Sequence, residues 1–522
     1  MAKIAKPSLP FAKRLVLNRY ILSLFGVENF EDLSIYVNKM EFEGWTEDRI
    51  SKFHYAVVQA LPLEGAQLNK DTLLAYDQNI VSHTLAIQGK RPEPIRWKYF
   101  QYLALLFTEI YLDRFMNDRE SFLDALNAYC NQFNAPLAAG DRVELFTEDD
   151  LRKIAFWSAT GSGKTLIMHM NIKQYLHHLT KSGRSRELNR MLLVTPNEGL
   201  SKQHKEEFEL SGIQADMFSK QGASLFTGKA IEIIEITKLT EAGGEKTVAL
   251  DAFESNNLVL VDEGHRGASG DVWGKNRRKL AAKGFTFEYS ATLGQATAGN
   301  LPLTQEYAKS ILFDYSYRYF YGDGYGKDYR ILNLADDNDE AIRELYLTAC
   351  LLTFYQQKVL FKDPRSKVKQ FNIENPLWVF VGGSVTKATS SKDISDTVDI
   401  VQFLARFTAL TNKASVLQRI ARAISGDTGL LSAKGHDIFA NAFPYLGDHM
   451  QTPEQLYDGI MRDIFNANGS ASLHIEDLKG ADGEISLRLG DNAPFGVINV
   501  GDSSKLCELL GKHQDINVSE KN

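Results

Sequence analysis

Hydrophobic and polar residues change their spacing along the chain, and the change marks segments of different secondary structure. Through residues 1–145 apolar side chains recur at helical spacing, most clearly in 100–115, so this part is expected to be mostly helical. It contains a break rich in turn formers at 134–141. From about residue 145 to 315, short apolar runs alternate with amphipathic stretches. The runs predicted to be strands are 154–157, 191–194, 231–236, 258–261 and 285–289.

Strand, loop, helix and strand in this order indicate a parallel α/β sheet with helices on both faces. Residues 315–329 then alternate tyrosine with other residues, which favours a β-hairpin with cross-strand aromatic pairs. The same rings would also suit stacking on unpaired bases. Apolar runs at 377–381 and 495–500 predict a second α/β region with polar helices between them. The tyrosines concerned are Tyr315, Tyr317, Tyr319, Tyr321 and Tyr325.

The composition is that of an ordinary globular protein, with 44% hydrophobic and 24% charged residues in a chain of 522. These values exclude a mostly disordered chain and a collagen-like fibre. The formal charge of −7 excludes a globally basic binder, so contact with nucleic acid would need local basic patches. Residues 151–210 hold ten lysines and arginines against five acids, and 265–283 hold six against one. Both could follow a phosphate backbone, although solvated helix faces have the same composition.

Cysteine spacing and the apolar runs indicate the compartment. Cys130, Cys350 and Cys507 lie far apart, which argues against a disulfide framework, a zinc ribbon and an iron–sulfur cluster. The sequence contains no run of about 18 uncharged apolar residues, so no membrane span is predicted. Arg14 and Arg19 interrupt the apolar stretch near the N-terminus, which disfavours a signal peptide. The expected location is therefore the cytoplasm, with no membrane partner.

The strongest chemical signal is Ser-Ala-Thr-Gly-Ser-Gly-Lys-Thr at residues 158–165, between a predicted strand and a predicted helix. Glycines let the backbone turn tightly so that its N–H groups point at phosphate oxygens. Lys164 can reach the β- and γ-phosphates, and the Thr165 hydroxyl is a ligand for Mg²⁺. A plain Gly/Ser turn is the alternative. The residues expected to bind ATP are Thr160, Gly161, Ser162, Gly163, Lys164 and Thr165.

Two further motifs follow predicted strands. Asp262 and Glu263 end the run 258–261; Asp262 is expected to hold Mg²⁺ and Glu263 to orient and deprotonate the attacking water. An ordinary turn would carry the same residues, and His265 two positions on could be a packed or solvent-facing histidine. Ser290 and Thr292 in Tyr-Ser-Ala-Thr are small hydroxyl residues that could connect an ATP site to a neighbouring element.

The phosphate loop, Asp-Glu-x-His and Ser-Ala-Thr in this order resemble the superfamily-two helicases and translocases of the DExH type. Within that superfamily they are most similar to type III restriction-like, or DEAD/DEAH-box, helicase subunits, as are segments 98–113 and 494–502. The resemblance implies an α/β fold with a RecA-like parallel-sheet ATPase lobe and an incomplete second lobe. The implied domains are a helical N-terminal domain at 1–145, the first RecA-like lobe at 146–315, an aromatic connector and helix at 316–375, and the start of the second lobe with a helical insertion at 376–522.

The resemblance also implies catalytic roles for Glu263, His265, Ser290 and Thr292, with ATP and Mg²⁺ as cofactors. Nucleic acid is the implied partner, double-stranded DNA in preference, and a methyltransferase or nuclease subunit is a further candidate. The family's arginine-containing motif is not found before Asn522, so an N-terminal portion of a longer protein, weakly active alone, is expected. The residues implied to contact nucleic acid are Thr195, Pro196, Asn197, Gln203 and Thr237.

The expected function is therefore an ATP-dependent helicase or translocase of a restriction or phage-defence system. An ATP-gated nucleic-acid-binding switch without processive unwinding is the alternative. A phosphate-loop kinase is a third interpretation, against which the Asp-Glu-x-His and Ser-Ala-Thr motifs argue. The three differ in whether nucleic acid accelerates ATP turnover and whether a bound strand is displaced.

Overall fold

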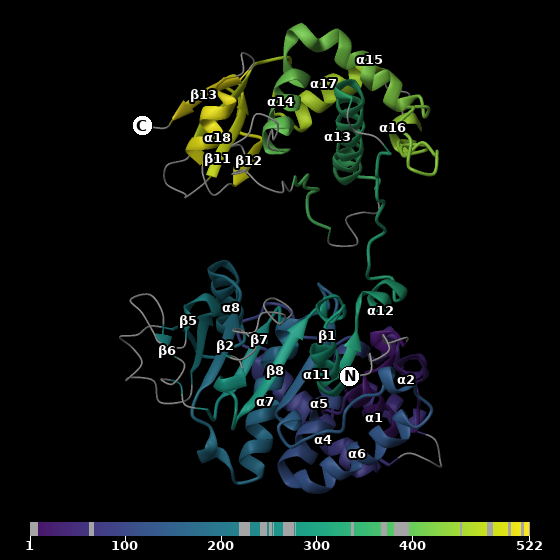
Figure 1. Ribbon diagram of the computed structural model, residues 1–522, viewed down its shortest axis with the longest axis vertical. Helices are drawn as coiled ribbons and strands as arrows, with labels where there is room; N and C mark the ends of the chain where they lie inside the picture. The colour runs from purple at the N-terminus through teal and green to yellow at the C-terminus, as the bar shows by residue number, and fades with distance from the viewer. Residues whose placement is uncertain are drawn as a thin grey trace, which may run out of the picture. The chain divides into compact units, whose positions relative to one another are not determined.

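The chain forms two compact units, Met1–Asp328 and Tyr329–Asn522 (Figure 1). The computed structural model describes residues 9–61, 67–218, 230–240, 248–249, 253, 255–264, 276, 278–335, 339–366, 373–380, 396–448, 452–477, 484–499, 503–512 and 516–520.

The first unit is organised around a seven-stranded sheet in the order β3-β4-β2-β7-β8-β1-β9, in which every neighbouring pair is parallel. The five strands predicted from apolar runs are all present, and a parallel sheet is confirmed. Two short strands, β3 and β9, were not predicted. The bounds are β1 (Lys153–Ser158), β2 (Met191–Thr195), β3 (Ala215–Met217), β4 (Ile231–Glu235), β7 (Leu258–Asp262), β8 (Phe285–Ser290) and β9 (Ile311–Tyr315), beside a small parallel pair, β5 (Leu239–Thr240) and β6 (Val248–Ala249).

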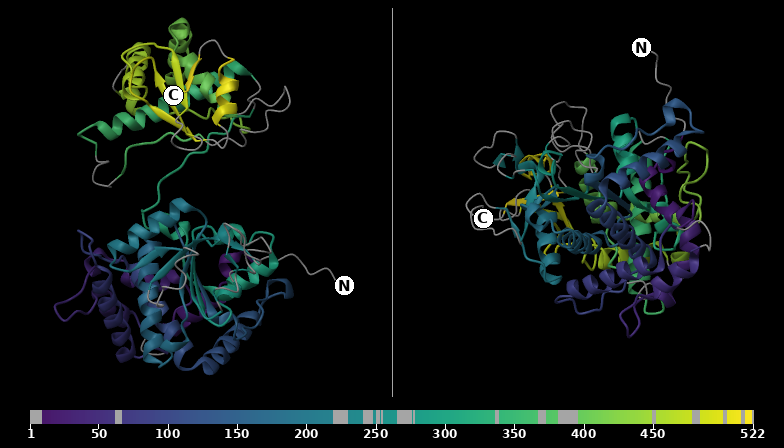
Figure 2. Two further views of the ribbon diagram at one scale, coloured as in Figure 1. Left: turned by 90° about the vertical axis from the view of Figure 1, so that its left-hand side faces the viewer. Right: turned by 90° about the horizontal axis from the view of Figure 1, so that it is seen from below.

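Helices of the first unit surround this sheet, as the two views in Figure 2 show. Several begin at a residue whose side chain accepts a hydrogen bond from a backbone N–H of the first turn, as Asn69 does for Thr72. Their bounds are α1 (Val16–Leu24), α2 (Phe30–Val37), α3 (Lys52–Ala60), α4 (Lys70–Ile87), α5 (Tyr99–Asn117), α6 (Arg119–Asn134), α7 (Lys164–Lys181), α8 (Glu198–Leu210), α10 (Leu293–Ala296), α11 (Leu301–Ser310) and α12 (Tyr317–Gly322).

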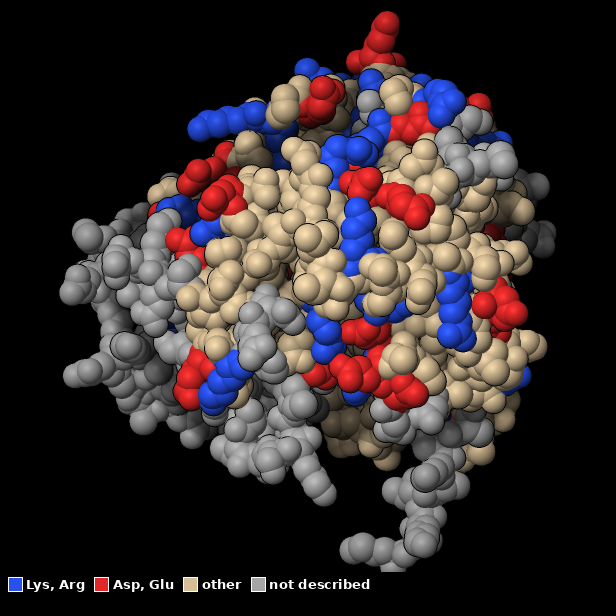
Figure 3. Space-filling view, turned by 90° about the horizontal axis from the view of Figure 1, so that it is seen from above, with Lys and Arg blue, Asp and Glu red and all other residues tan. Residues whose placement is uncertain are grey.

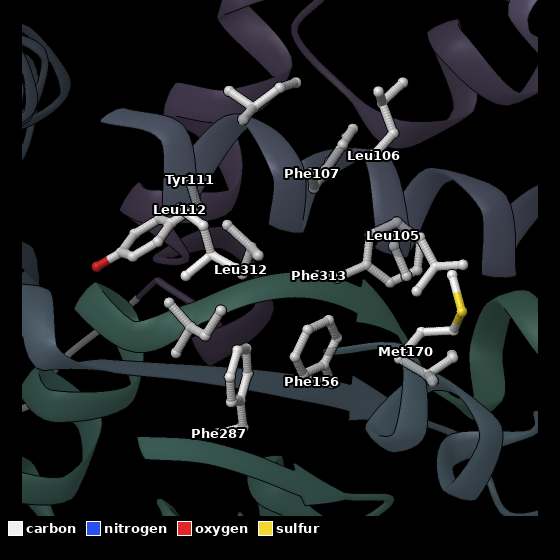
Figure 4. Close-up of a cluster of buried hydrophobic side chains, with 14 of the residues drawn as sticks. Leu105, Leu106, Phe107, Tyr111, Leu112, Phe156, Met170, Phe287, Leu312 and Phe313 are labelled. Atoms are coloured by element: carbon white, nitrogen blue, oxygen red, sulfur yellow. The ribbon is translucent and has the colours of Figure 1, made fainter. Parts of the chain in front are cut away.

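The N-terminal helices and the sheet share one hydrophobic core. Helix α5 is apolar on nearly every side and is almost wholly buried; its Phe107 packs against Phe313 of β9, with ring centroids 5.5 Å apart. Figure 4 shows side chains of α5 facing Phe156 of β1 and Phe287 of β8. Without the sheet, the apolar surface of α5 would be exposed to water, so the helical segment and the sheet stabilise each other.

The opposite face of the sheet is covered by a second, smaller set of apolar contacts. Side chains alternate along a strand, so Ala155 and Trp157 of β1 point away from α5 and pack with Leu303 and Tyr307 of α11. The Trp157 indole donates a hydrogen bond to the carbonyl of Ala291, 3.0 Å away. Both faces of the sheet are therefore covered, as the strand–helix alternation predicted.

The aromatic segment after the sheet is not the hairpin that its alternating tyrosines predicted. Tyr315 is the last residue of β9 and stacks on Phe100 at a centroid distance of 3.8 Å. The following residues form helix α12, whose helical spacing turns Tyr319 and Phe320 toward the core while Tyr317 and Tyr321 stay exposed. The prediction was wrong because the spacing of the tyrosines is compatible with a strand or with a helix when the segment packs against a core on one side only.

The second unit combines helices with a smaller mixed sheet of order β12-β11-β10-β13, in which only the β10–β13 pair is parallel. The strand predicted near 495–500 is β12, but described residues 373–380 contain no strand, so the prediction at 377–381 is wrong as far as residue 380; Val381 lies outside the described residues. The bounds are α13 (Glu340–Lys362), α14 (Asp396–Thr408), α15 (Lys413–Ile424), α16 (Pro444–Asp448), α17 (Pro453–Asp463), β10 (Leu473–Asp477), β11 (Glu484–Leu489), β12 (Gly496–Asn499), α18 (Ser503–Leu510) and β13 (Ile516–Glu520).

Two further features concern the surface and the helices. On the face drawn in Figure 3, lysine and arginine side chains are interspersed with aspartate and glutamate. Within the described parts of the chain, no helix has both the length and the apolar character needed to cross a membrane.

Candidate functional site

The phosphate-loop sequence lies where its motif requires, between the end of β1 and the start of α7. Gly161 has a φ of 84° and Gly163 a φ of 86°, values that a residue with a Cβ adopts only with strain. The left-handed conformation at Gly163 makes it the N-cap of α7 and turns the loop into the first helical turn. A helix N-terminus with this glycine-rich approach suits an anion, because unpaired backbone N–H groups and the helix dipole face the same point.

A residue outside the motif, Gln101 of α5, supports the loop. Its Nε2 donates a hydrogen bond to the carbonyl of Ser162 at 2.9 Å, and its Oε1 accepts one from the backbone N–H of Lys98. A Cβ added at Gly163 would overlap Gln101 Nε2. Gln101 lies in segment 98–113, whose sequence resembles restriction-like helicase subunits, but no role was predicted for it. A glutamine in the first turn of an apolar helix is not by itself a recognisable motif.

Lys164 lies half-buried at the first position of α7, directed back toward its own loop. Its Nζ donates to the carbonyls of Ser158 at 3.3 Å and Ala159 at 3.4 Å. Burial lowers the pKa of Lys164, while the carboxylates of Glu263 and Asp262 act in the opposite direction. The lysine and the two acids therefore lie close enough to interact electrostatically, although they are about a hundred residues apart in the sequence.

Asp262 ends β7, the neighbour of β2 and β8 in the sheet, and both of its carboxylate oxygens accept hydrogen bonds. Oδ1 accepts the backbone N–H of Glu263 at 3.0 Å, and Oδ2 accepts Nε2–H of His204 at 2.9 Å. Burial alone would raise the pKa of the Asp262 carboxyl, but the hydrogen bond from His204 and the attraction of His204 and Lys164 hold it below its ordinary value. Asp262 is thus kept ionised, as a metal ligand must be.

Glu263 follows in an unusual backbone conformation, with a φ of 53°. A residue other than glycine in the left-handed region costs of order 1 kcal/mol or more, and such residues concentrate at functional sites. The backbone N–H of the next residue, Gly264, donates to the carbonyl of Tyr289 in β8 at 3.1 Å. That bond ties the Asp-Glu turn to the strand that carries the Ser-Ala-Thr motif.

Ser290 is the buried last residue of β8, and its Oγ accepts a hydrogen bond from the backbone N–H of Thr292 at 3.1 Å. Register pairs Asp262 with Tyr289, so Ser290 lies one residue beyond the end of that ladder. The Oγ1 of Thr292 is buried and has no hydrogen-bond partner among the described residues. The two hydroxyls and the two acids therefore lie at the same edge of the sheet.

The segment expected to touch nucleic acid joins β2 to α8 at this same edge. Asn197 is the N-cap of α8, its Oδ1 accepting the backbone N–H of Leu200 at 2.9 Å, and Asn197 and Gln203 are exposed. Pro196 is half-buried. Thr195 is buried, and its hydroxyl lies 2.6 Å from that of Ser201, so its side chain fixes the start of α8 instead of facing solvent.

The remaining expected positions are Thr237 and His265. Thr237 is exposed, in the short turn that follows β4, at the edge of the sheet where β2 ends. His265 lies outside the described residues, as does most of the basic patch at 265–283. Because the carboxyl ends of parallel strands meet at one edge, the described parts of all the predicted motifs converge there.

Several of the ten lysines and arginines in the basic patch at 151–210 form ion pairs with nearby carboxylates, which reduces the positive charge that this patch can offer to a phosphate backbone. The pairs are Lys153 with Glu288 and Glu306, Lys181 with Asp113, Arg184 with Glu187, Arg190 with Glu232, and Lys202 with Glu198.

The residues at this edge fit a nucleotide with a hard divalent cation. The hydroxyl of Ser162 in the loop, like that of Thr292, is buried with no hydrogen-bond partner in the described part of the chain, and a phosphate oxygen would satisfy either group. Mg²⁺ prefers oxygen ligands and needs only one or two carboxylates beside water and phosphate. The ionised carboxylate of Asp262 and the hydroxyl of Thr165 supply that donor set.

Comparisons with known proteins agree with this site. Residues 116–295, which include the phosphate loop, Asp262 and Ser290, match the family described as type III restriction enzyme, res subunit. No match is found among curated proteins.

Three solved structures are similar to this chain at low identity. They are the UvsW helicase of bacteriophage T4 (14% identity, 42% of this chain and 82% of that one, TM-score 0.23), the SWI2/SNF2 ATPase core of Sulfolobus solfataricus in complex with dsDNA (11%, 70% and 74%, 0.23) and the Hef helicase domain of Pyrococcus furiosus (12%, 76% and 85%, 0.27). At these TM-scores the likeness carries no argument, and the assignment depends on the family match, the strand order and the motifs. On that basis, residues 116–295, about a third of the chain, are similar to the family described as type III restriction enzyme, res subunit.

Proposed function

We propose that this chain is an ATP-dependent motor acting on nucleic acid, with double-stranded DNA as the preferred substrate, in a restriction or phage-defence system. The observation that carries the proposal is the convergence of the phosphate loop, the Asp262–Glu263 turn and the Ser290–Thr292 segment with the first turn of α8 at one edge of the sheet. The role in defence follows from the family's description alone.

The proposed chemistry assigns each side chain one task. The loop N–H groups and Lys164 bind the phosphates, and the burial of Lys164 leaves its charge poorly solvated until an anion arrives. Mg²⁺, when bound by Thr165 and Asp262, would neutralise charge on the phosphates. Glu263 accepts a proton from the attacking water. Ser290 and Thr292 connect the ATP site to a neighbouring element of the fold. His265 retains the role that the family resemblance implies.

Nucleic acid is proposed to lie along Pro196, Asn197, Gln203 and Thr237, with Thr195 acting indirectly through its bond to Ser201. Asn197, Gln203 and Thr237 carry uncharged polar groups, suited to contacting a sugar–phosphate backbone without reading base sequence. ATP binding and hydrolysis would then alternate two conformations of the site, and repeated cycles would move the strand.

The decisive experiment compares the wild-type protein with Lys164→Ala in three measurements: ATP binding by calorimetry with Mg²⁺, ATP turnover with and without duplex DNA, and displacement of a triplex-forming strand. Loss of a charge-assisted contact predicts about 10- to 100-fold weaker ATP binding in the variant. Equal ATP affinity in the two proteins refutes the phosphate-loop assignment. DNA-stimulated turnover without strand displacement instead supports the nucleic-acid-binding switch, and turnover indifferent to any nucleic acid supports the kinase.

A further inference from the structure

His204 connects the proposed nucleic-acid segment to the proposed metal ligand, and no motif of the sequence points to it. It lies in the middle of α8, and its Nε2 is 2.9 Å from Oδ2 of Asp262, with side-chain exposures of 4% and 12%. The carboxylate oxygens only accept, so Nε2 is the donor in this contact. The two residues are 58 positions apart in the sequence, which is why sequence reasoning missed the pair.

The ring of His204 cannot move independently of its helix. It lies near Phe208, one turn further along α8, with ring centroids 6.4 Å apart, and Phe208 in turn stacks on His169 of α7 at a centroid distance of 4.4 Å. A buried aromatic cluster of this kind holds side chains in fixed rotamers. Any displacement of α8 is therefore carried to the imidazole.

The beginning of α8 is equally well fixed to the proposed nucleic-acid contacts. The Ser201 hydroxyl lies 2.6 Å from that of Thr195 and also donates to the carbonyl of Asn197 at 3.0 Å. Gln203 and Lys202, adjacent to His204, are exposed. One short helix thus carries exposed polar groups on one side and the hydrogen bond to Asp262 on the other.

We propose that His204 is a positioning residue that fixes the Asp262 carboxylate for Mg²⁺ and couples nucleic-acid binding to Mg²⁺–nucleotide binding. The inference depends on the proposed function, because it takes Asp262 as the metal ligand and α8 as a nucleic-acid contact. The bonds to Glu263 N–H and His204 leave each carboxylate oxygen one lone pair, so the orientation of the group is set while it can still bind a cation or its water. Coupling of this kind is reciprocal: nucleic acid alters nucleotide affinity by the same factor as nucleotide alters nucleic-acid affinity.

The first test measures binding of a fluorescent ADP analogue with and without Mg²⁺, in the absence of nucleic acid. Removing the donor in His204→Leu should reduce the gain in affinity that Mg²⁺ provides by about tenfold, while affinity without Mg²⁺ stays at the wild-type value. His204→Gln should retain the gain, because the Gln Nε2 can replace the imidazole donor. His204→Asn, whose amide is too short to reach Asp262, gives a polar substitute for the Leu variant if that variant does not fold.

His169→Leu is the matched control, since His169 is equally buried, packs on the same Phe208 ring and bonds to Ser211 instead of Asp262. It should leave the Mg²⁺ gain unchanged. A His204→Leu or His204→Asn protein with the wild-type Mg²⁺ gain overturns the inference, and so does an equal loss in His169→Leu, which would mean general packing.

The second test repeats the titration with a duplex oligonucleotide present. The wild-type protein should show a change in Mg²⁺–nucleotide affinity that the Gln variant keeps and the Leu variant loses; an unchanged response in the Leu variant refutes the coupling. Lys164→Ala separates the two levels of the argument. If the wild-type protein and Lys164→Ala bind nucleotide equally, the proposed function fails and this inference with it. If only Lys164→Ala loses binding and His204→Leu matches the wild type, the inference alone fails.

Discussion

Replacing Gly163 by alanine should damage the phosphate loop through two separable effects. The backbone at Gly163 has a φ of 86°, where a Cβ costs about 1–2 kcal/mol of strain. The new methyl group would also overlap Nε2 of Gln101, the atom that donates to the carbonyl of Ser162 at 2.9 Å. The end of a glutamine can move aside, so the second cost is that of the hydrogen bond, about 1 kcal/mol. Together they predict a loss of about 2–3 kcal/mol in the free energy of unfolding.

Gly183 at the other end of α7 offers a matched control. Its φ is 73°, and a Cβ there would meet no heavy atom within 4 Å among the described residues. Gly183→Ala should therefore show the strain alone, about 1–2 kcal/mol. Urea unfolding of the two variants, monitored by tryptophan fluorescence, gives the difference, and Trp157 lies in the same sheet as the loop.

A double-mutant cycle with Gln101→Ala isolates the contact itself. If the methyl group acts by displacing Gln101, the Gly163→Ala substitution should cost about 1 kcal/mol less in the Gln101→Ala background than in the wild type. Equal costs of Gly163→Ala in both backgrounds, or equal destabilisation by Gly163→Ala and Gly183→Ala, would refute the reasoning that Gln101 supports the loop. ADP affinity measured on the same proteins should fall in Gly163→Ala and stay near the wild-type value in Gly183→Ala.

Three further predictions concern hydrolysis, pH and salt. Glu263→Gln keeps the size of the side chain and removes the base, so ATP should still bind while turnover falls about 10²-fold or more; unchanged turnover would exclude Glu263 as the base. Burial raises the pKa of Asp77, a residue of α4, to about 6 from an ordinary value of 3.8. The folded state therefore holds the Asp77 proton more tightly than the unfolded state. The free energy of unfolding should fall by ~3 kcal/mol as pH rises from about 4 to above 6. Asp77→Asn should lose that part of the pH dependence in urea unfolding, and an identical pH profile would show that Asp77 does not titrate in this range. If two or more lysines or arginines of the 151–210 and 265–283 patches neutralise phosphates, affinity measured by fluorescence anisotropy should fall about tenfold or more between about 50 and 200 mM salt and depend little on base sequence, whereas a flat response would contradict phosphate contacts by these patches.

The sequence by itself determined the central strands, their parallel class and the position of the phosphate loop. These features are local: a strand buried on both faces is a short apolar run, and a loop that turns into a helix N-terminus needs glycine where φ is positive, as at Gly161 and Gly163. The order of motifs along the chain also placed the phosphate loop, Asp262 and Ser290 at the ends of parallel strands, and those ends share one edge of the sheet.

Tertiary structure alone decided which side chains meet across elements. The hydrogen bonds from Gln101 to the Ser162 carbonyl and from His204 to Asp262 join helices to loops or strand ends far away in the sequence. Neither the residue types nor their spacing predicts such a pair. The tyrosine-rich segment became α12 because its neighbours offered a core to one face of a helix, and residues 377–380 formed no strand although their pattern allows one. Spacing reports the period a segment can adopt, whereas the surface available for burial decides which period is used, because burial of apolar area outweighs the small differences in local propensity.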